Sequence, residues 1–185
     1  MQLDELLFEV FRKMRVLQKE HGITLNVKDF DQVAVIGDPD RLEQVLINLV
    51  DNAIKYTPTG GAVDMSLSQA DGWAKIDICD SGIGIPAEDI PHIFNRFYRV
   101  DEGRARAQGG HGLGLSIVEW IVASHEGRIE VVSEVDEGTT FTVFLPAIPD
   151  PVEEDDGESD TGQTSRIMVL LPWMNRGRND ETEDE

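Results

Sequence analysis

The stretch EQVLINLVDNAIKYT, residues 43–57, carries apolar residues at helical spacing. Asp38-Pro39 precedes it and is typical of a helix start, because an acidic N-cap residue is followed by proline at the first helical position. Thr57-Pro58-Thr59-Gly60-Gly61 follows it and would end a helix. We therefore predict a helix from about residue 40 to residue 56.

Three polar residues share one flank of this helix. At about 100° per residue, Asn48, Asn52 and Lys55 form a single stripe, roughly a quarter turn from the apolar side. Carboxamide oxygens are hard neutral ligands that suit Mg²⁺, and an ammonium group suits a polyphosphate. From this helix alone, the alternative of a solvated flank with no role stays open.

Helices and strands alternate along the rest of the chain. Periodicity predicts helices at residues 3–20, 87–93 and 113–125, the last closed by Gly127, and strands at 23–27, 33–36, 63–68, 73–79, 128–133 and 139–145. Turns at Asp71-Gly72 and Asp136-Glu137-Gly138 link strand pairs, which implies antiparallel pairing. We predict a two-layer α/β sandwich with a mixed, mostly antiparallel sheet and helices on one face, rather than a doubly wound parallel sheet.

The segment Asp80-Ser81-Gly82-Ile83-Gly84-Ile85-Pro86 follows a predicted strand. Its two glycines allow a tight turn in which backbone can closely approach a ligand. An aspartate at a strand end can accept a hydrogen bond from an exocyclic amine. An ordinary Asp-Gly turn explains the same residues.

A glycine-rich run, Gly109-Gly110-His111-Gly112-Leu113-Gly114-Leu115, opens the predicted helix at 113–125. Glycine-rich backbone that leads into a helix N-terminus can bind phosphate, because free N–H groups and the helix dipole face the anion. The run lacks the Gly-Lys-Ser/Thr ending of a Walker A loop and the G-x-G-x-x-G spacing of a dinucleotide site. A flexible hinge is the alternative interpretation.

The amino-acid composition excludes several kinds of binding partner and location for this protein. The net charge of −20 argues against nonspecific nucleic-acid binding and against direct contact with an anionic membrane surface. Cys79 is the only cysteine, which excludes an internal disulfide and suits a reducing cytoplasm. No apolar stretch approaches the roughly 20 residues of a membrane span. We expect a cytoplasmic location, with membrane anchoring possible for a longer native protein.

Three segments are expected along the chain. Residues 1–22 form an N-terminal helix and residues 23–148 form the main domain. Residues 149–185 are acidic, with 12 of the 36 Asp and Glu residues after residue 149, and we expect disorder there. An apolar island at 167–174 interrupts this tail and can dock on the domain or on a partner.

Taken together, these motifs resemble the ATP-binding catalytic domain of sensor histidine kinases. EQVLINLVDNAIKYT resembles the N box of this family, DSGIGIP the G1 box, IFNRFYRVD the F box, GGHGLGLSIV the G2 box and GTTFTVFLP the closing strand motif. The resemblance covers about residues 3–147, with all boxes in order. The wider superfamily includes gyrase-type topoisomerases, MutL-type repair proteins and a heat-shock chaperone.

The resemblance implies a Bergerat-type α/β sandwich that holds ATP and Mg²⁺ under a mobile lid at residues 99–112. It implies a role for each box residue. Asn48 and Asn52 would bind Mg²⁺ and phosphates, and Lys55 would bind the phosphates. Tyr56 and Asp80 would contact the adenine, and the base pocket would be completed by Gly82, Gly84 and Ile85, while the phosphates would be enclosed by Gly110, Gly112, Leu113, Gly114 and Leu115. Arg99 and, as a weaker candidate, Arg96 would stabilise the transferring phosphoryl group, and Thr140 of the closing strand would also contact the nucleotide.

Two departures from the family pattern bear on function. His111 stands where a small residue is usual, and we interpret it as a tolerated substitution that can alter lid contacts. None of His21, His92, His111 and His125 lies in the phosphoacceptor context of the family. The acceptor histidine is therefore expected on a dimerisation domain, upstream in the native protein or on another chain, with a response regulator downstream.

Position 48 separates kinases from hydrolases in this superfamily. The ATP-hydrolysing relatives carry a glutamate there as general base, whereas the carboxamide of Asn48 cannot take a proton. The sequence therefore favours phosphoryl transfer to histidine, catalysed by a site that includes Asn48 and Arg99. Two alternatives remain: a nucleotide-dependent interaction module without kinase activity, and a serine kinase of the anti-sigma type.

Overall fold

The computed structural model describes residues 1–100 and 112–149. The elements run in the order α1 (Leu3–His21), β1 (Thr24–Phe30), α2 (Pro39–Tyr56), β2 (Ala62–Ala70), β3 (Trp73–Asp80), the 3₁₀ turn η1 (Ile90–His92), α4 (Gly114–Ser124), β4 (Arg128–Glu134) and β5 (Gly138–Pro146). The chain divides into one unit at residues 1–150 and a second at 151–185. The predicted acidic tail and its apolar island lie outside the described residues.

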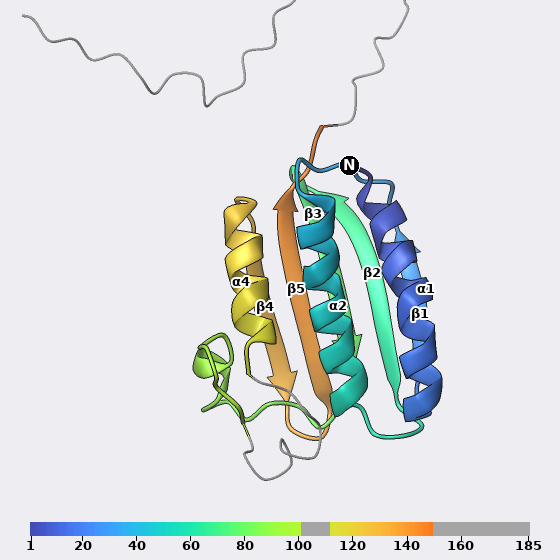
Figure 1. Ribbon diagram of the computed structural model, residues 1–185, viewed down its shortest axis with the longest axis vertical. Coiled ribbons are helices and arrows are strands. Elements are labelled where there is room, and N and C mark those ends of the chain that lie inside the picture. The colour runs from blue at the N-terminus through green and yellow to red at the C-terminus, as the bar shows by residue number, and fades with distance from the viewer. Residues whose placement is uncertain (101–111, 150–185) are drawn as a thin grey trace, which may run out of the picture. The chain divides into compact units, whose positions relative to one another are not determined.

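One five-stranded sheet forms the back layer, in the order β1-β2-β3-β5-β4. β1 and β2 are parallel, whereas the other three pairings are antiparallel. The helices α1, α2 and α4 all cover the same face of this sheet (Figure 1). The predicted two-layer sandwich with a mixed, mostly antiparallel sheet is confirmed.

The core lies between the helices and the sheet because both layers turn one apolar side inward. Every second residue of β5 from Thr139 to Leu145 is buried, as expected for a strand with one covered face. On α2 the buried residues Leu42, Val45, Leu46, Leu49, Val50, Ala53 and Ile54 recur at helical spacing. α2 therefore packs on the sheet and leaves its polar flank facing α4.

The first turn of α2 is capped as the sequence predicts. Asp38 Oδ1 accepts hydrogen bonds from the backbone N–H groups of Asp40, at 3.0 Å, and Arg41, at 3.2 Å. Pro39 occupies the first helical position, where its missing N–H costs nothing. This cap fixes where the site-bearing helix begins.

Replacing Asp38 with alanine is expected to lower the free energy of unfolding by about 1 kcal/mol, because these two N–H groups lose their acceptor. Asp40→Ala is the matched control, since it removes an acidic residue from the same turn without removing the cap, and should cost about half as much or less. Urea unfolding of both variants tests this. Equal losses would show that charge at the helix end, rather than capping, is responsible.

Two of the predicted elements are smaller than expected. Residues 33–36 form only isolated bridges, Ala34 with Gln2 and Val35 with Ala147, because each neighbouring segment meets them at a single residue. The helix predicted at 87–93 is reduced to η1. Asp89, His92 and Asn95 each donate to the carbonyl three residues earlier, which is the tighter 3₁₀ winding, and Pro91 has no N–H to donate.

The end of α4 also differs from the prediction. The left-handed residue is Glu126, with φ of 58°, and Gly127 does not have a positive φ. Gly127 is required for a different reason: a Cβ there would lie 2.4 Å from the Phe144 carbonyl oxygen of β5. The glycine therefore permits a close approach of α4 to the sheet, and its N–H closes the helix end by donating to the Val122 carbonyl oxygen at 3.0 Å.

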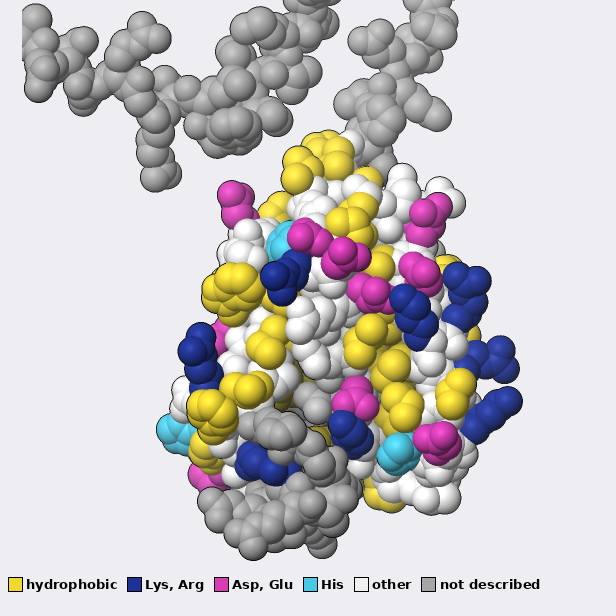
Figure 2. Space-filling model, in the orientation of Figure 1, with side chains coloured by type: hydrophobic (Ala, Val, Ile, Leu, Met, Phe, Trp, Pro, Cys, Tyr) yellow, Lys and Arg dark blue, Asp and Glu magenta, His cyan; other side chains and the backbone are white. Residues whose placement is uncertain are grey.

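The surface carries both positively and negatively charged side chains. α1 exposes Arg12, Lys13, Arg15 and Lys19, and Figure 2 shows Lys and Arg side chains gathered along the edge where α1 lies. Within residues 1–100 and 112–149, no helix has the length and apolar character needed to cross a membrane.

Candidate functional site

The N-box helix, the G1 segment and the start of α4 meet at one end of the sandwich, the lower end in Figure 1. The backbone N–H of Ile83 donates to the Tyr56 carbonyl oxygen at 3.1 Å, which joins the G1 segment to the last turn of α2. Asn48 Oδ1 lies 3.6 Å from where a Cβ on Gly114 would be, which places the middle of α2 against the start of α4. Segments far apart in sequence thus form one site.

Asp80 is the most distinctive group in this site. It ends β3 with only 7% of its surface exposed. Its Oδ1 accepts from the N–H groups of Gly82, at 2.9 Å, and Thr139, at 3.3 Å. No donor in the described part of the chain reaches Oδ2. Burial raises the pKa of the Asp80 carboxyl, and the two N–H bonds partly offset that rise.

Gly82 and Gly84 shape the turn that follows Asp80. A Cβ at Gly82 would lie 2.5 Å from Asp80 Oδ1 and 2.7 Å from the Tyr56 carbonyl oxygen. Gly84 has φ of 69°, and a Cβ there would lie 2.0 Å from the Glu134 carbonyl oxygen. Only glycine lets the turn pack this closely, as the G1 pattern predicts.

The β4–β5 hairpin holds the G1 turn from the other side. Ile85 N–H donates to Ser133 Oγ at 2.8 Å, and Asp136 N–H donates to the Ile83 carbonyl oxygen at 2.9 Å. Ser133 Oγ in turn bonds to the Gly138 carbonyl oxygen at 3.0 Å. The G1 turn is therefore fixed to a distant hairpin by hydrogen bonds at Ile83 and Ile85.

Thr139, and not the predicted Thr140, reaches Asp80. In the β3–β5 register Thr139 pairs with Asp80, whereas Thr140 pairs with exposed Cys79. Side chains alternate along a strand, so Thr140 lies on the face away from the helices. Thr139 is thus the threonine that supports Asp80, and the nucleotide contact of Thr140 stays a prediction.

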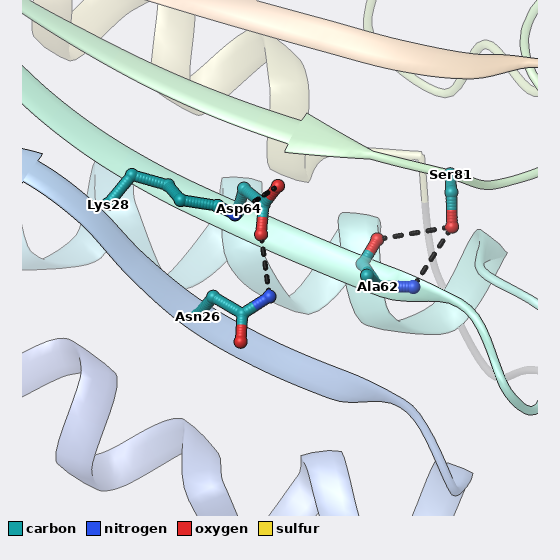
Figure 3. Close-up of polar contacts among 5 residues, drawn as sticks. All are labelled: Asn26, Lys28, Ala62, Asp64 and Ser81. Atoms are coloured by element: carbon teal, nitrogen blue, oxygen red, sulfur yellow. Dashed lines mark hydrogen bonds and ion pairs between the residues drawn. The ribbon is translucent and has the colours of Figure 1, made fainter.

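Ser81 anchors the start of the G1 segment to β2. Its Oγ accepts from Ala62 N–H at 2.9 Å and donates to the Ala62 carbonyl oxygen at 3.3 Å (Figure 3). In the same view Asp64 accepts from Asn26 at 2.7 Å and pairs with Lys28, which ties β1 to β2. These bonds hold the strand end that carries Asp80.

The carboxamides of Asn48 and Asn52 are half-buried on the flank of α2. Neither side chain forms a hydrogen bond with any other described residue, so their oxygens are available to a ligand. Lys55 is on the same flank but pairs with Asp51, with Nζ 2.5 Å from Oδ2. Tyr56 ends the helix with 47% of its surface exposed, beside the G1 turn.

Within the described residues, no side chain caps the first turn of α4. Its N-cap residue is Leu113, whose side chain cannot cap, so the N–H groups of Gly114, Leu115 and Ser116 have no partner within the helix. Gly112 has φ of 67°, and its carbonyl oxygen accepts from Phe97 N–H at 2.8 Å. Gly110 and His111 lie outside the described residues, as do residues 101–109 of the predicted lid.

The F box lies beside this helix start. Arg96 and exposed Phe97 line a surface groove together with Leu113, Ser116, Ile117 and Trp120 of α4. Arg99 is half-buried in the same segment. Tyr98 donates to Asp89 Oδ1 at 2.5 Å, which fixes the F box to the loop after the G1 segment.

Comparisons with known proteins agree with this geometry. The sequence pattern of histidine kinase-, DNA gyrase B-, and HSP90-like ATPases matches residues 37–149. A solved structure of the mycobacterial sensor histidine kinase MprB has a TM-score of 0.70 and 32% identity, covering 81% of this chain and 97% of that one. The chain belongs to this family, on its sensor histidine kinase branch. The resemblance drawn from the boxes is thereby confirmed.

Curated relatives place the domain within longer kinases. The sensor-like histidine kinase SenX3 of Mycolicibacterium smegmatis is 37% identical over 158 residues, which is 85% of this chain and 41% of that protein. The sensor histidine kinase CusS of Escherichia coli is 39% identical over 139 residues, or 75% of this chain and 28% of that protein. This kinase domain thus spans less than half the length of these relatives.

Sequence reasoning missed the residues that support the site from a distance. Ser81, Ser133 and Thr139 position the G1 turn, and each looks like an ordinary strand or turn residue in the sequence. Thr139 could have been found by counting from the Gly138 turn, because the buried face of β5 includes Phe141 and Val143. No local signal identifies Ser133.

Proposed function

We propose that this kinase domain binds MgATP and transfers the γ-phosphoryl group to a histidine on a separate helical domain. The observation that carries the proposal is Asp80, whose Oδ2 is open inside a glycine-lined turn. An accessible carboxylate oxygen without a donor, on a residue that is otherwise buried, is a selective acceptor for the exocyclic amine of adenine. The solved structure of the kinase ShkA, at 29% identity and a TM-score of 0.69 over 80% of this chain, is a complex with the ATP analogue AMPPNP.

Adenine would lie between the G1 turn and the end of α2. Asp80 would accept from its amine, and Tyr56 would stack on the ring, which its exposed position beside Ile83 permits. Gly82, Gly84 and Ile85 would line the pocket with backbone. Of these groups, Asp80 and Ile85 are already held by hydrogen bonds to β5 and β4.

Asn48 and Asn52 fit a magnesium site. Both are half-buried, neither is hydrogen-bonded to a described residue, and neutral carboxamide oxygens suit a hard cation that also keeps waters and phosphate oxygens. When bound, Mg²⁺ would neutralise phosphate charge during transfer. The residues of this chain orient the triphosphate: α4 offers the N–H groups of Gly114 and Leu115, and Gly110, Gly112 and Leu113 would close around the phosphates.

Lys55, Arg96 and Arg99 are the proposed cations of the phosphate side. Lys55 would leave Asp51 or share it with the nucleotide, and its place one helical turn beyond Asn52 supports this role. Arg99 would stabilise the transferring phosphoryl group, with Arg96 as the weaker candidate. Asn48 cannot accept a proton, so water attack is disfavoured and transfer to a supplied histidine is favoured.

The acceptor helix would approach at the F-box groove, which Arg96, Phe97 and Trp120 line along α4. This groove combines apolar side chains with one cation and adjoins the proposed phosphate site. Its place explains how a histidine on another domain could reach the γ-phosphoryl group. The phosphorylated histidine would then serve a response regulator, and we propose a cytoplasmic location for these reactions.

The test uses the full chain, labelled MgATP and a two-helix acceptor domain from a sensor histidine kinase. We expect acid-labile label on the acceptor and almost none when its histidine is replaced by glutamine. Release of phosphate without acceptor should be slow, because Asn48 supplies no base. Normal ATP binding without label on histidine would contradict the kinase proposal and favour an interaction module, whereas acid-stable label would favour a serine kinase.

A further inference from the structure

His125 joins α4 to α2 through hydrogen bonds of opposite sense. Its Nδ1 lies 2.8 Å from the Ile121 carbonyl oxygen in its own helix. Its Nε2 lies 3.0 Å from the backbone nitrogen of Asp38, the residue that caps α2. A carbonyl can only accept and a backbone N–H can only donate, so these two contacts match the tautomer with its proton on Nδ1 and a lone pair on Nε2.

Packing holds the ring in this position. A Cβ at Gly37 would lie 2.9 Å from His125 Cδ2 and 2.8 Å from Leu42 Cδ1, so the imidazole lies directly on a residue without a side chain. Asp38 uses its carboxylate for the first turn of α2, which leaves its N–H to His125. Both partners of the hydrogen bond between His125 and Asp38 are therefore held in place.

This contact mirrors the one at the nucleotide site. α2 and α4 run side by side in opposite directions (Figure 1). From Asp38 to Asn48 is about 15 Å along α2, and from Gly114 to His125 is about 16 Å along α4, at 1.5 Å per residue. Asn48 lies against Gly114 at the site end, and Asp38 bonds to His125 at the other end. The two helices thus touch at both ends of a matched length.

We infer that His125 is a positioning residue for the phosphate side of the site, acting from the end of α4 remote from the nucleotide. The inference rests on the proposed binding of MgATP between Asn48 and the start of α4. Without the bond to Asp38, α4 can tilt on the sheet, and its first N–H groups then move relative to Asn48. ATP affinity should fall although no residue that touches ATP has changed.

Two substitutions of His125 test its hydrogen bond to Asp38 and its hydrogen bond to Ile121 separately. The amide of His125→Gln reaches the position of Nε2 and can accept from Asp38, whereas the shorter amide of His125→Asn reaches only the position of Nδ1 and can donate to Ile121. Ser124→Ala is the control, because Ser124 Oγ bonds to the same Ile121 carbonyl oxygen, at 2.6 Å, and lies 3.4 Å from His125 Nδ1, so its loss removes contacts within α4 but none to α2.

Calorimetric titration of the full-length variants with MgATP measures the effect. We expect His125→Asn to bind about three- to tenfold more weakly than the original chain, and His125→Gln and Ser124→Ala to stay within about twofold. Equal affinities for the Asn and Gln variants would overturn the inference. Thermal unfolding of each variant shows whether it is folded.

Nitrogen NMR of His125 in the unaltered chain is the second measurement and does not depend on any variant. We expect a protonated Nδ1 and an unprotonated Nε2 at neutral pH. Protonation of Nε2 would overturn the inference. Failure of the unaltered chain to bind MgATP would instead contradict the proposed function.

Discussion

Asp80→Asn should bind MgATP about 100-fold more weakly than the original chain. In the variant, the amide oxygen can keep the hydrogen bonds from Gly82 and Thr139, and the amide nitrogen then occupies the place of Oδ2. A donor would face the exocyclic amine of adenine, which is also a donor. A buried site that loses its acceptor in this way discriminates strongly.

Inosine triphosphate turns this loss into a change of specificity. It carries a carbonyl oxygen where ATP carries the amine, so the Asp80→Asn amide nitrogen can donate to it. We expect the variant to prefer inosine triphosphate and the original chain to prefer ATP in competition titrations. Asp77→Asn is the matched control, because Asp77 lies on the same strand but bonds to Thr142 on the open face. A similar loss of ATP affinity in both variants would contradict the assignment of Asp80.

Because the pKa of Asp80 is raised in the folded chain, the free energy of unfolding depends on pH. The carboxyl binds its proton more tightly in the folded chain than in the unfolded chain, mainly because of burial. Its contribution to stability is therefore present at low pH and is lost as pH rises from the unfolded pKa through the folded pKa. Asp80→Asn should consequently unfold at the same or a higher urea concentration at neutral pH, so weaker ATP binding cannot be attributed to unfolding.

Gly84→Ala should lower the free energy of unfolding by about 3 kcal/mol. Part of this loss is the cost of a left-handed backbone for alanine, and the rest comes from the Cβ, which would lie 2.0 Å from the Glu134 carbonyl oxygen. One of the two backbones must move. Because Ile83 and Ile85 bond to the β4–β5 hairpin, that movement also displaces the proposed base pocket.

Gly72→Ala separates the effect of the steric contact at Gly84 from the effect of the left-handed backbone. Gly72 has φ of 78°, close to the 69° of Gly84, but a Cβ there would have no atom within 4 Å. Its substitution should cost only about 1 kcal/mol, which is the strain of the left-handed backbone. Denaturant unfolding of both variants, with ATP titration of each, checks the prediction. Equal losses of stability would show that the hairpin gives way easily at Glu134.

Local chemistry makes much of the fold predictable. The cap at Asp38 and the apolar period are enough to define α2, and short turns that end in glycine define two antiparallel strand pairs. The contact of Thr139 with Asp80 was missed because a strand's inward face depends on a register that a family motif alone did not determine. Residues 33–36 were overestimated because a strand needs neighbours, and theirs meet them at single residues.

The supporting contacts of the site could not be predicted, because they join residues remote in sequence. Asp38 and His125 are 87 residues apart, and Ile85 and Ser133 are 48 apart. No local sequence signal at either position identifies the partner. The box residues could be proposed from the sequence because their chemistry shows in short local patterns, such as an acid before glycines or a glycine before a helix.

The sheet order has a consequence for the order of folding. β3 pairs with β5, so the Thr139 bond to Asp80 spans 59 residues and holds the proposed base pocket from the C-terminal side. During synthesis, a chain that has emerged only as far as α4 already has Asp80, Asn48 and Asn52 but not the hairpin that holds the G1 turn. Such long-range pairing forms late. Nucleotide binding would therefore act as a completion signal, stabilising only chains whose final hairpin is in place.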